Sequence, residues 1–131
     1  YPGYPGAAHA LSQAYFARGL TLLQADMAAQ ALDHFERSTN LRDSAPNVRY
    51  AAGLAHLQLE DLAAAEAEFI AAIELDEDHV PALQNLANIL DRTGRQQDAV
   101  PYYLRVARLT PHLATIEAAR NATYDEKILL K

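Results

Sequence analysis

Five histidines are the side chains of this chain best suited to acid–base or metal chemistry, and they stand at positions 9, 34, 56, 79 and 112. A zinc-binding pair would place two histidines one helical turn apart, as in His-Glu-x-x-His, and no such pair occurs. His79 follows Asp78, and the two could in principle join a metal site. Their place at a junction between segments favours a solvated loop instead, and His56 is expected to pack.

Other groups that carry chemistry are missing or wrongly spaced. The chain has no cysteine, which excludes disulfides, thiolate zinc sites and cysteine nucleophiles. Its five glycines are too scattered to form a phosphate-binding loop. The acidic run at 76–78 lacks the length and the glycine of a calcium loop. We therefore expect no enzymatic activity, no metal and no cofactor.

Composition narrows the classes of partner. The 131 residues suit one domain, and a net charge of -6 argues against a nucleic-acid footprint. No apolar run is long enough to span a membrane. The tripeptide beginning at Asn121 fits the N-glycosylation pattern but falls in an expected helix. A first residue other than Met, together with the excess of Arg over Lys, favours a processed, exported bacterial protein.

The strongest pattern in the sequence is a repeat of 34 residues. The structural elements of this repeat must position any side chains that bind a partner. Small and large residues recur at this spacing, as four sets: Gly19, Gly53 and Ala87; Ala31, Ala65 and Ala99; Phe35, Phe69 and Tyr103; Leu41, Leu75 and Leu109. A period of this length is typical of stacked helical repeats. The small residues would let paired helices approach closely, and the aromatic residues would fill the gap between one unit and the next.

This pattern resembles the tetratricopeptide repeat, with frames at 12–45, 46–79 and 80–113 and a capping helix at 114–131. The resemblance implies an all-α, right-handed helix–turn–helix solenoid of seven helices, two for each repeat and one at the end. The chain lacks the family's Trp, and of the three closing prolines only Pro111 is present. The helix boundaries are expected near Met27, Ser44, Asp61, His79, Gly94 and Thr110.

The resemblance also implies a concave face, built mainly from the first helix of each unit and able to hold an extended peptide. We expect this groove to be apolar at one end and rich in amides at the other. Its candidate contact residues are Phe16, Leu20, Tyr50, Leu54, Gln84, Asn85 and Asn88. The family's grip on a C-terminal carboxylate uses Lys, and no Lys occurs before position 127, so a ligand of that kind is not expected.

Residues 1–10 precede the repeats and contain Tyr-Pro-Gly twice in tandem, which predicts an extended arm with no helix until about Ala7. Two functions stay open. The chain is a scaffold that binds a peptide from another protein, or it is a subunit that assembles head to tail into a filament. In the second case the arm residues Tyr1, Pro2, Tyr4 and Pro5 would contact the groove or the end of another copy.

Overall fold

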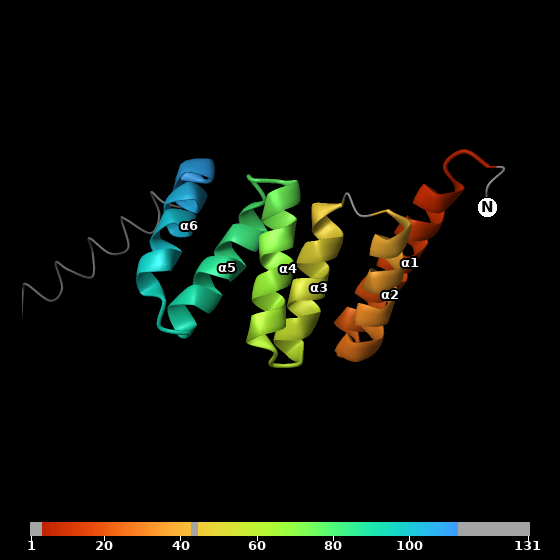
Figure 1. The fold of residues 1–131 in the computed structure, drawn as a ribbon, viewed down its shortest axis with the longest axis horizontal. Helices are drawn as coiled ribbons and strands as arrows, with labels where there is room; N and C mark the ends of the chain where they lie inside the picture. Colours follow the sequence, from red (N-terminus) through yellow and green to blue (C-terminus); the bar gives the residue numbers. More distant parts are fainter. Residues whose placement is uncertain (1–3, 43–44, 113–131) are drawn as a thin grey trace, which may run out of the picture.

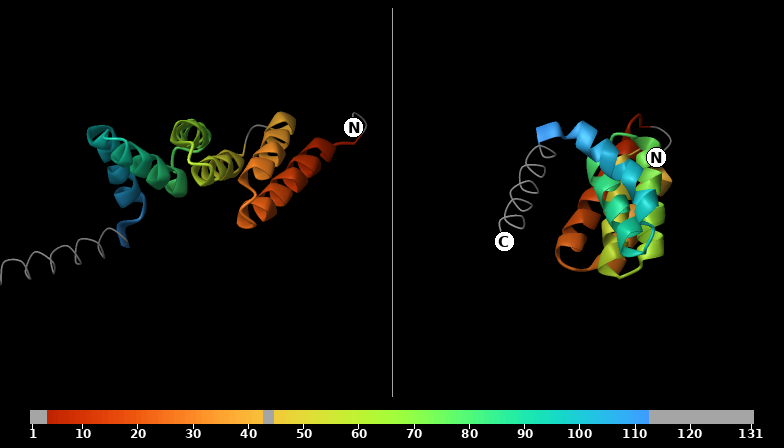
Figure 2. Two further views of the ribbon diagram at one scale, coloured as in Figure 1. Left: turned by 90° about the horizontal axis from the view of Figure 1, so that it is seen from below. Right: turned by 90° about the vertical axis from the view of Figure 1, so that its left-hand side faces the viewer.

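Helices pair into hairpins that stack in chain order (Figure 1). The computed structural model describes residues 4–42 and 45–112. Within these ranges it contains six helices and no strand: α1 (Ala7–Gln24), α2 (Ala28–Leu41), α3 (Pro46–Gln58), α4 (Leu62–Leu75), α5 (Val80–Arg92) and α6 (Gln96–Leu109). Figure 2 shows the same row from below and from one end. The predicted all-α solenoid is confirmed, and helix ends lie beside Met27, Asp61, His79, Gly94 and Thr110, as expected.

The turn inside each hairpin follows the 34-residue period in its backbone as well as in its sequence. Asp26, Glu60 and Gly94 occupy equivalent positions and have φ angles of 59°, 59° and 79°. Only the third of these left-handed residues is a glycine, the residue that adopts such angles without steric cost. The second turn adds a capping bond, because the Asp61 carboxylate accepts a hydrogen bond from the Ala64 amide at 3.1 Å.

A glycine and an aromatic ring hold the two helices of the first and second hairpins together. A Cβ atom at Gly53 would lie only 2.5 Å from the Phe69 ring, and one at Gly19 would lie 2.5 Å from the Phe35 ring. Both rings are almost fully buried. The glycines therefore make room for the aromatic side chain, which is a stricter requirement than the close approach of backbones predicted from the sequence.

The third hairpin departs from this arrangement. Its equivalent residues are Ala87 and Tyr103, and the prediction that Tyr103 fills the gap between units is wrong, since 43% of it is exposed. Ala87 carries the Cβ atom for which the other two hairpins have no room, so the ring lies elsewhere. Partial burial, and then the neighbouring carboxylate of Asp91, raise the pKa of Tyr103.

The core consists of two clusters that share one leucine. The first joins α1 and α2 to one side of α3, and includes Phe35 and Val48. The second joins α4, α5 and α6, and includes Phe69 and Leu86. Leu54 of α3 packs against both clusters. The helix α3 is therefore the connection between the two parts of the core.

The two ends of the chain differ from the predicted organisation or lie outside the described residues. The helix α1 begins at Ala7, as predicted, so residues 7–10 of the segment 1–10 that was assigned to the arm are helical. The expected capping helix and the Asn121 tripeptide lie outside the described residues, as does the expected boundary at Ser44. No helix in the described ranges is long and apolar enough to cross a membrane.

Candidate functional site

The apolar half of the predicted groove is carried by α1 and α3. Phe16 and Tyr50 are half-buried, and each packs against an aromatic residue of the core. The Phe16 and Phe35 ring centroids are 5.9 Å apart, and those of Tyr50 and Phe69 are 5.7 Å apart. Each of the two rings is thus held by the core, and the remaining part of it reaches the surface.

Leu20 and Leu54 are half-buried residues of the same two helices. Leu20 packs against the first core cluster, while Leu54 packs against both. All four apolar candidates therefore contribute to core packing, which limits how far any of them could move to meet a ligand. A ligand would meet a preformed apolar surface, because these side chains already have fixed neighbours.

The amide half lies on α5. Gln84 and Asn88 are exposed, and no hydrogen bond of their side chains is seen in the described structure. Asn85 is half-buried, and its Nδ2 donates to the carbonyl oxygen of Pro81 in the same helix at 2.8 Å. A side-chain amide has both donor and acceptor groups. Gln84 and Asn88 could therefore both donate hydrogen bonds to the backbone carbonyl groups of an extended chain and accept them from its backbone N–H groups.

His79 joins the two halves, and the sequence interpretation of it as a loop residue in solvent is wrong. It is only 8% exposed and caps α5: its Nδ1 accepts a hydrogen bond from the Ala82 amide at 3.2 Å. Its Nε2 then carries the proton and donates to Asn47 Oδ1 at 2.8 Å. The ring also packs on Tyr50, with the centroids 5.2 Å apart.

His79 was missed because histidine is not a preferred capping residue, although the proline two positions after it marks a helix start. The contacts of His79 fix the position of α5 relative to α3 at this surface. Asn47 and Tyr50 of α3 are tied to the first turn of α5, so the apolar and amide halves are held in one relative position. No group of three His, Asp or Glu side chains that could hold a metal ion occurs among the residues that the structure describes.

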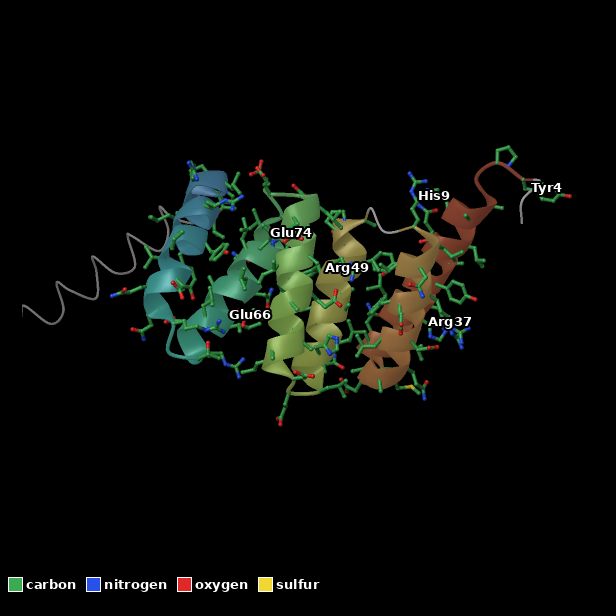
Figure 3. All side chains as sticks on the ribbon, in the orientation of Figure 1. Tyr4, His9, Arg37, Arg49, Glu66 and Glu74 are labelled. Carbon is green, nitrogen blue, oxygen red and sulfur yellow. The ribbon has the colours of Figure 1, made fainter. Side chains whose placement is uncertain are left out.

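The charged groups of the first hairpin lie at the surface. The Arg37 guanidinium stands over the Tyr15 ring at 5.8 Å and pairs with Asp33 at 3.2 Å. A hydrogen bond with Tyr15, and then the charge of Asp33, raise the pKa of Arg37. Figure 3 shows Arg37 at the outer edge of the hairpin. Since the pair is exposed, it is worth little to stability.

The described part of the arm does not fold back on the chain. Tyr4 is 78% exposed, and Figure 3 places it beyond the start of α1. Its carbonyl oxygen accepts a hydrogen bond from the Ala7 amide at 3.1 Å, which links it to the helix. Pro5 is also exposed, while Tyr1 and Pro2 lie outside the described residues. Within one copy, Tyr4 and Pro5 therefore leave the apolar half of the groove uncovered.

The helical hairpins stack on one another, and in the first two a glycine of the first helix packs on an aromatic ring of the second, a contact that we call the glycine–aromatic lock. The first helices of the hairpins, α1, α3 and α5, carry the candidate surface. These features define a helix–turn–helix repeat protein. The chain belongs to the tetratricopeptide repeat family, whose model matches residues 46–79 and 80–113, just over half of the chain. This is a protein-interaction fold. No curated protein matches the chain significantly.

Solved structures of the same fold are similar in shape at low identity. The crystal structure of MamA aligns at 19% identity with a TM-score of 0.72 over 76% of this chain. The first TPR of Spaghetti (RPAP3), bound to the HSP90 peptide SRMEEVD, aligns at 17% identity with a TM-score of 0.74, over 92% of this chain and 97% of that one. The second TPR domain of human RPAP3, in complex with the HSP70 peptide SGPTIEEVD, reaches 18% and 0.75, over 80% and 88%. The chain spans 58% of the length of MamA.

Proposed function

We propose that this chain is a non-enzymatic scaffold that holds an extended segment of a partner protein on the surface formed by α1, α3 and α5. The observation that carries the proposal is the order of side chains along this surface. Half-buried Phe16, Tyr50 and Leu54 are followed by exposed Gln84 and Asn88. Apolar side chains of a partner would pack at one end, and its backbone would bond the amides at the other.

The structural relatives support the peptide part of this proposal. Two of them were solved with HSP90 and HSP70 peptides that end in Glu-Val-Asp. The partner of this chain should differ from these, because Lys occurs only at 127 and 131 and the first repeat has Phe16 and Leu20 at its groove positions. We expect a segment with large apolar side chains at one end and uncharged residues in an extended conformation at the other. An acidic C-terminus is not expected.

Selection from a phage-displayed library of random 12-residue peptides tests this function. Selected peptides should be apolar at one end, and their affinity should fall by roughly tenfold in Asn88→Ala, which removes an amide that bonds the peptide backbone. Asn40→Ala is the matched control, because Asn40 is also an exposed amide and lies on α2. If both variants bind the selected peptides as tightly as the parent chain, the surface of first helices is not the site.

The alternative function is a structural subunit that assembles through its N-terminal arm. Its support is the exposure of Tyr4 and Pro5, an aromatic and a rigid residue that cover no surface of the described chain. Large aromatic rings gain most from burial, and proline lowers the entropy lost when a segment is ordered. The arm residues Tyr1, Pro2, Tyr4 and Pro5 would then contact the apolar half of the groove on another copy.

Sedimentation velocity over a range of concentrations separates the two functions. A scaffold stays monomeric with or without residues 1–6, whereas a subunit of a filament forms larger species that the deletion abolishes. Tyr4→Ala should weaken assembly in the same direction, and Tyr15→Ala, which removes a ring from the body of the first hairpin, is the control. Species of unchanged mass after the deletion would rule out the arm as the contact.

A further inference from the structure

A groove formed by second helices lies between α4 and α6, with α5 as its floor. It contains two adjoining hollows of about 450 and 390 Å³, which share Ile70, Leu86 and Tyr102. Leu86 and Leu90 of the floor are almost fully buried. Ile70 of α4 is 38% exposed, and Tyr102 of α6 is half-buried. The middle of this groove is therefore apolar and partly open to solvent, and charged side chains line its ends.

The repeat supplies an internal comparison, because an equivalent hollow of about 490 Å³ lies between α2 and α4 over α3. Its lining residues stand 34 positions earlier. Seven pairs result, each given with the residue of the α2–α4 groove before that of the α4–α6 groove: Leu32 and Glu66, Glu36 and Ile70, Thr39 and Ile73, Asn40 and Glu74, Ala52 and Leu86, His56 and Leu90, and Glu68 and Tyr102.

The two grooves thus share a position in the repeat and differ in chemistry. In the α2–α4 groove, Glu68 also pairs with Arg49 at 3.4 Å, so charged groups occupy the space. The fold accepts polar side chains at these positions. Ile70 belongs to neither core cluster, whereas Ile73 and Tyr102 pack against the second cluster with part of their surface exposed. Apolar side chains that stay partly open to solvent beside one another form a surface on which another molecule can pack.

Charges around the α4–α6 groove define what would fit it. Glu66 near one end forms a two-pronged ion pair with Arg95, at 2.9 and 2.6 Å. Glu74 and Glu77 lie near the other end, together with Arg105, whose guanidinium donates to the backbone carbonyl of Glu77. Figure 3 shows Glu66 and Glu74 toward opposite ends of α4. Since Asp98 adds a further carboxylate, acidic side chains outnumber guanidinium groups along the rim.

We propose that the groove between α4 and α6 is a second docking surface, which takes an amphipathic, basic helix of a partner protein. Leucine-like side chains on one face of that helix would cover Ile70, Ile73 and Tyr102, and its Lys or Arg side chains would reach Glu74 and Glu77. The flanking helices each have 14 residues, which corresponds to a length of about 21 Å. The surface would therefore hold about four helical turns of the partner.

The probe is an acetylated, amidated 14-residue Leu/Lys peptide with leucines at helical spacing, labelled with fluorescein and measured by anisotropy at physiological salt with the full chain. We expect saturable binding of one peptide for each chain. Ile70→Gln/Tyr102→Gln should weaken it roughly tenfold or more, because the apolar contact is lost at unchanged net charge. Glu74→Gln/Glu77→Gln should weaken it roughly threefold to tenfold and flatten its salt dependence.

Two controls separate docking from general attraction to an acidic protein. The variant Asp26→Asn/Glu36→Gln removes the same number of carboxylates elsewhere and should bind as the parent chain does. A peptide with Ser in place of every Leu should not bind. Circular dichroism verifies that the variants fold, and Glu74 and Glu77 are exposed, so their substitution leaves the core intact. Equal binding of the Ser peptide, equal loss in the Asp26/Glu36 control, or no saturable binding at all would overturn the proposal.

Discussion

The variant Gly53→Ala tests the glycine–aromatic lock, because the structure predicts a sign opposite to that of an ordinary helical glycine. At an exposed helix position, Gly→Ala stabilises by about 0.5–1 kcal/mol. Here the new methyl group would stand 2.5 Å from Cε1 and 2.8 Å from Cδ1 and Cζ of Phe69, which is fully buried. Overpacking of this kind costs about 1–3 kcal/mol. The net expectation is a loss of about 0.5–2 kcal/mol in the free energy of unfolding.

Urea denaturation followed by circular dichroism at 222 nm measures this change. With a denaturant slope of about 1–3 kcal/mol per molar for a small protein, the midpoint should fall by roughly 0.5 M. Gly19→Ala should behave alike, because its new methyl group would meet the Phe35 ring at the same distance of 2.5 Å. A raised midpoint for Gly53→Ala would show that the ring moves aside without cost, and the lock would then be no explanation for the two glycines.

A double mutant identifies the ring as the cause. Phe69→Leu alone should destabilise the chain through a cavity, but the smaller leucine leaves space for the methyl group that Gly53→Ala introduces. The combined loss should therefore be smaller than the sum of the two single losses by about 1 kcal/mol. Strict additivity would mean that the two positions do not meet.

Three further predictions concern single positions. Phe69→Ala should lower the free energy of unfolding by about 3–5 kcal/mol, because the side chain is fully buried and leaves a cavity; an unchanged denaturation midpoint would contradict this. Ser38→Ala should cost about 1–3 kcal/mol, because the buried hydroxyls of Ser12 and Ser38 each donate to the other residue's backbone carbonyl oxygen, at 2.9 and 2.8 Å; a variant as stable as the parent chain would disprove this contribution. Glu60→Gly should stabilise by about 0.5 kcal/mol, measured as a raised midpoint, because Glu60 holds the left-handed angle that Gly94 adopts freely; a lowered midpoint would show that the angle carries no strain.

The helices could be predicted from the sequence because their determinants are local and repeat. The period of 34 residues marked where each helix begins and ends, and Pro46 and Gly94 stand where a helix start and a turn need them. Tyr103 could not be predicted in the same way. Its position in the repeat equals that of Phe69, but the facing helix has Ala87 where the second hairpin has Gly53, and 43% of Tyr103 is exposed.

The candidate surface was harder to predict, because it depends on which side chains bond to each other. Nothing in the spacing of Asn47 and His79, 32 residues apart, indicates that their side chains meet at 2.8 Å. Asn85 looks equivalent to Asn88 in sequence, yet its amide bonds back to its own helix. The groove between α4 and α6 was not predicted, because its chemistry becomes visible only when residues of three helices are placed around one hollow.

Because Leu54 packs against both core clusters, it affects how the chain unfolds. In a solenoid, stability is approximately the sum of the units and of the contacts between neighbours. Leu54 contributes to both core clusters, so it belongs to the contact term that joins them. Shortening it would lower cooperativity more than stability, and amide protons of α1 and α2 would then exchange at a different free energy from those of α5 and α6. Together with the contacts of Tyr50 and Asn47 to the second half of the chain, Leu54 thus influences whether the array unfolds as a single unit or in two steps.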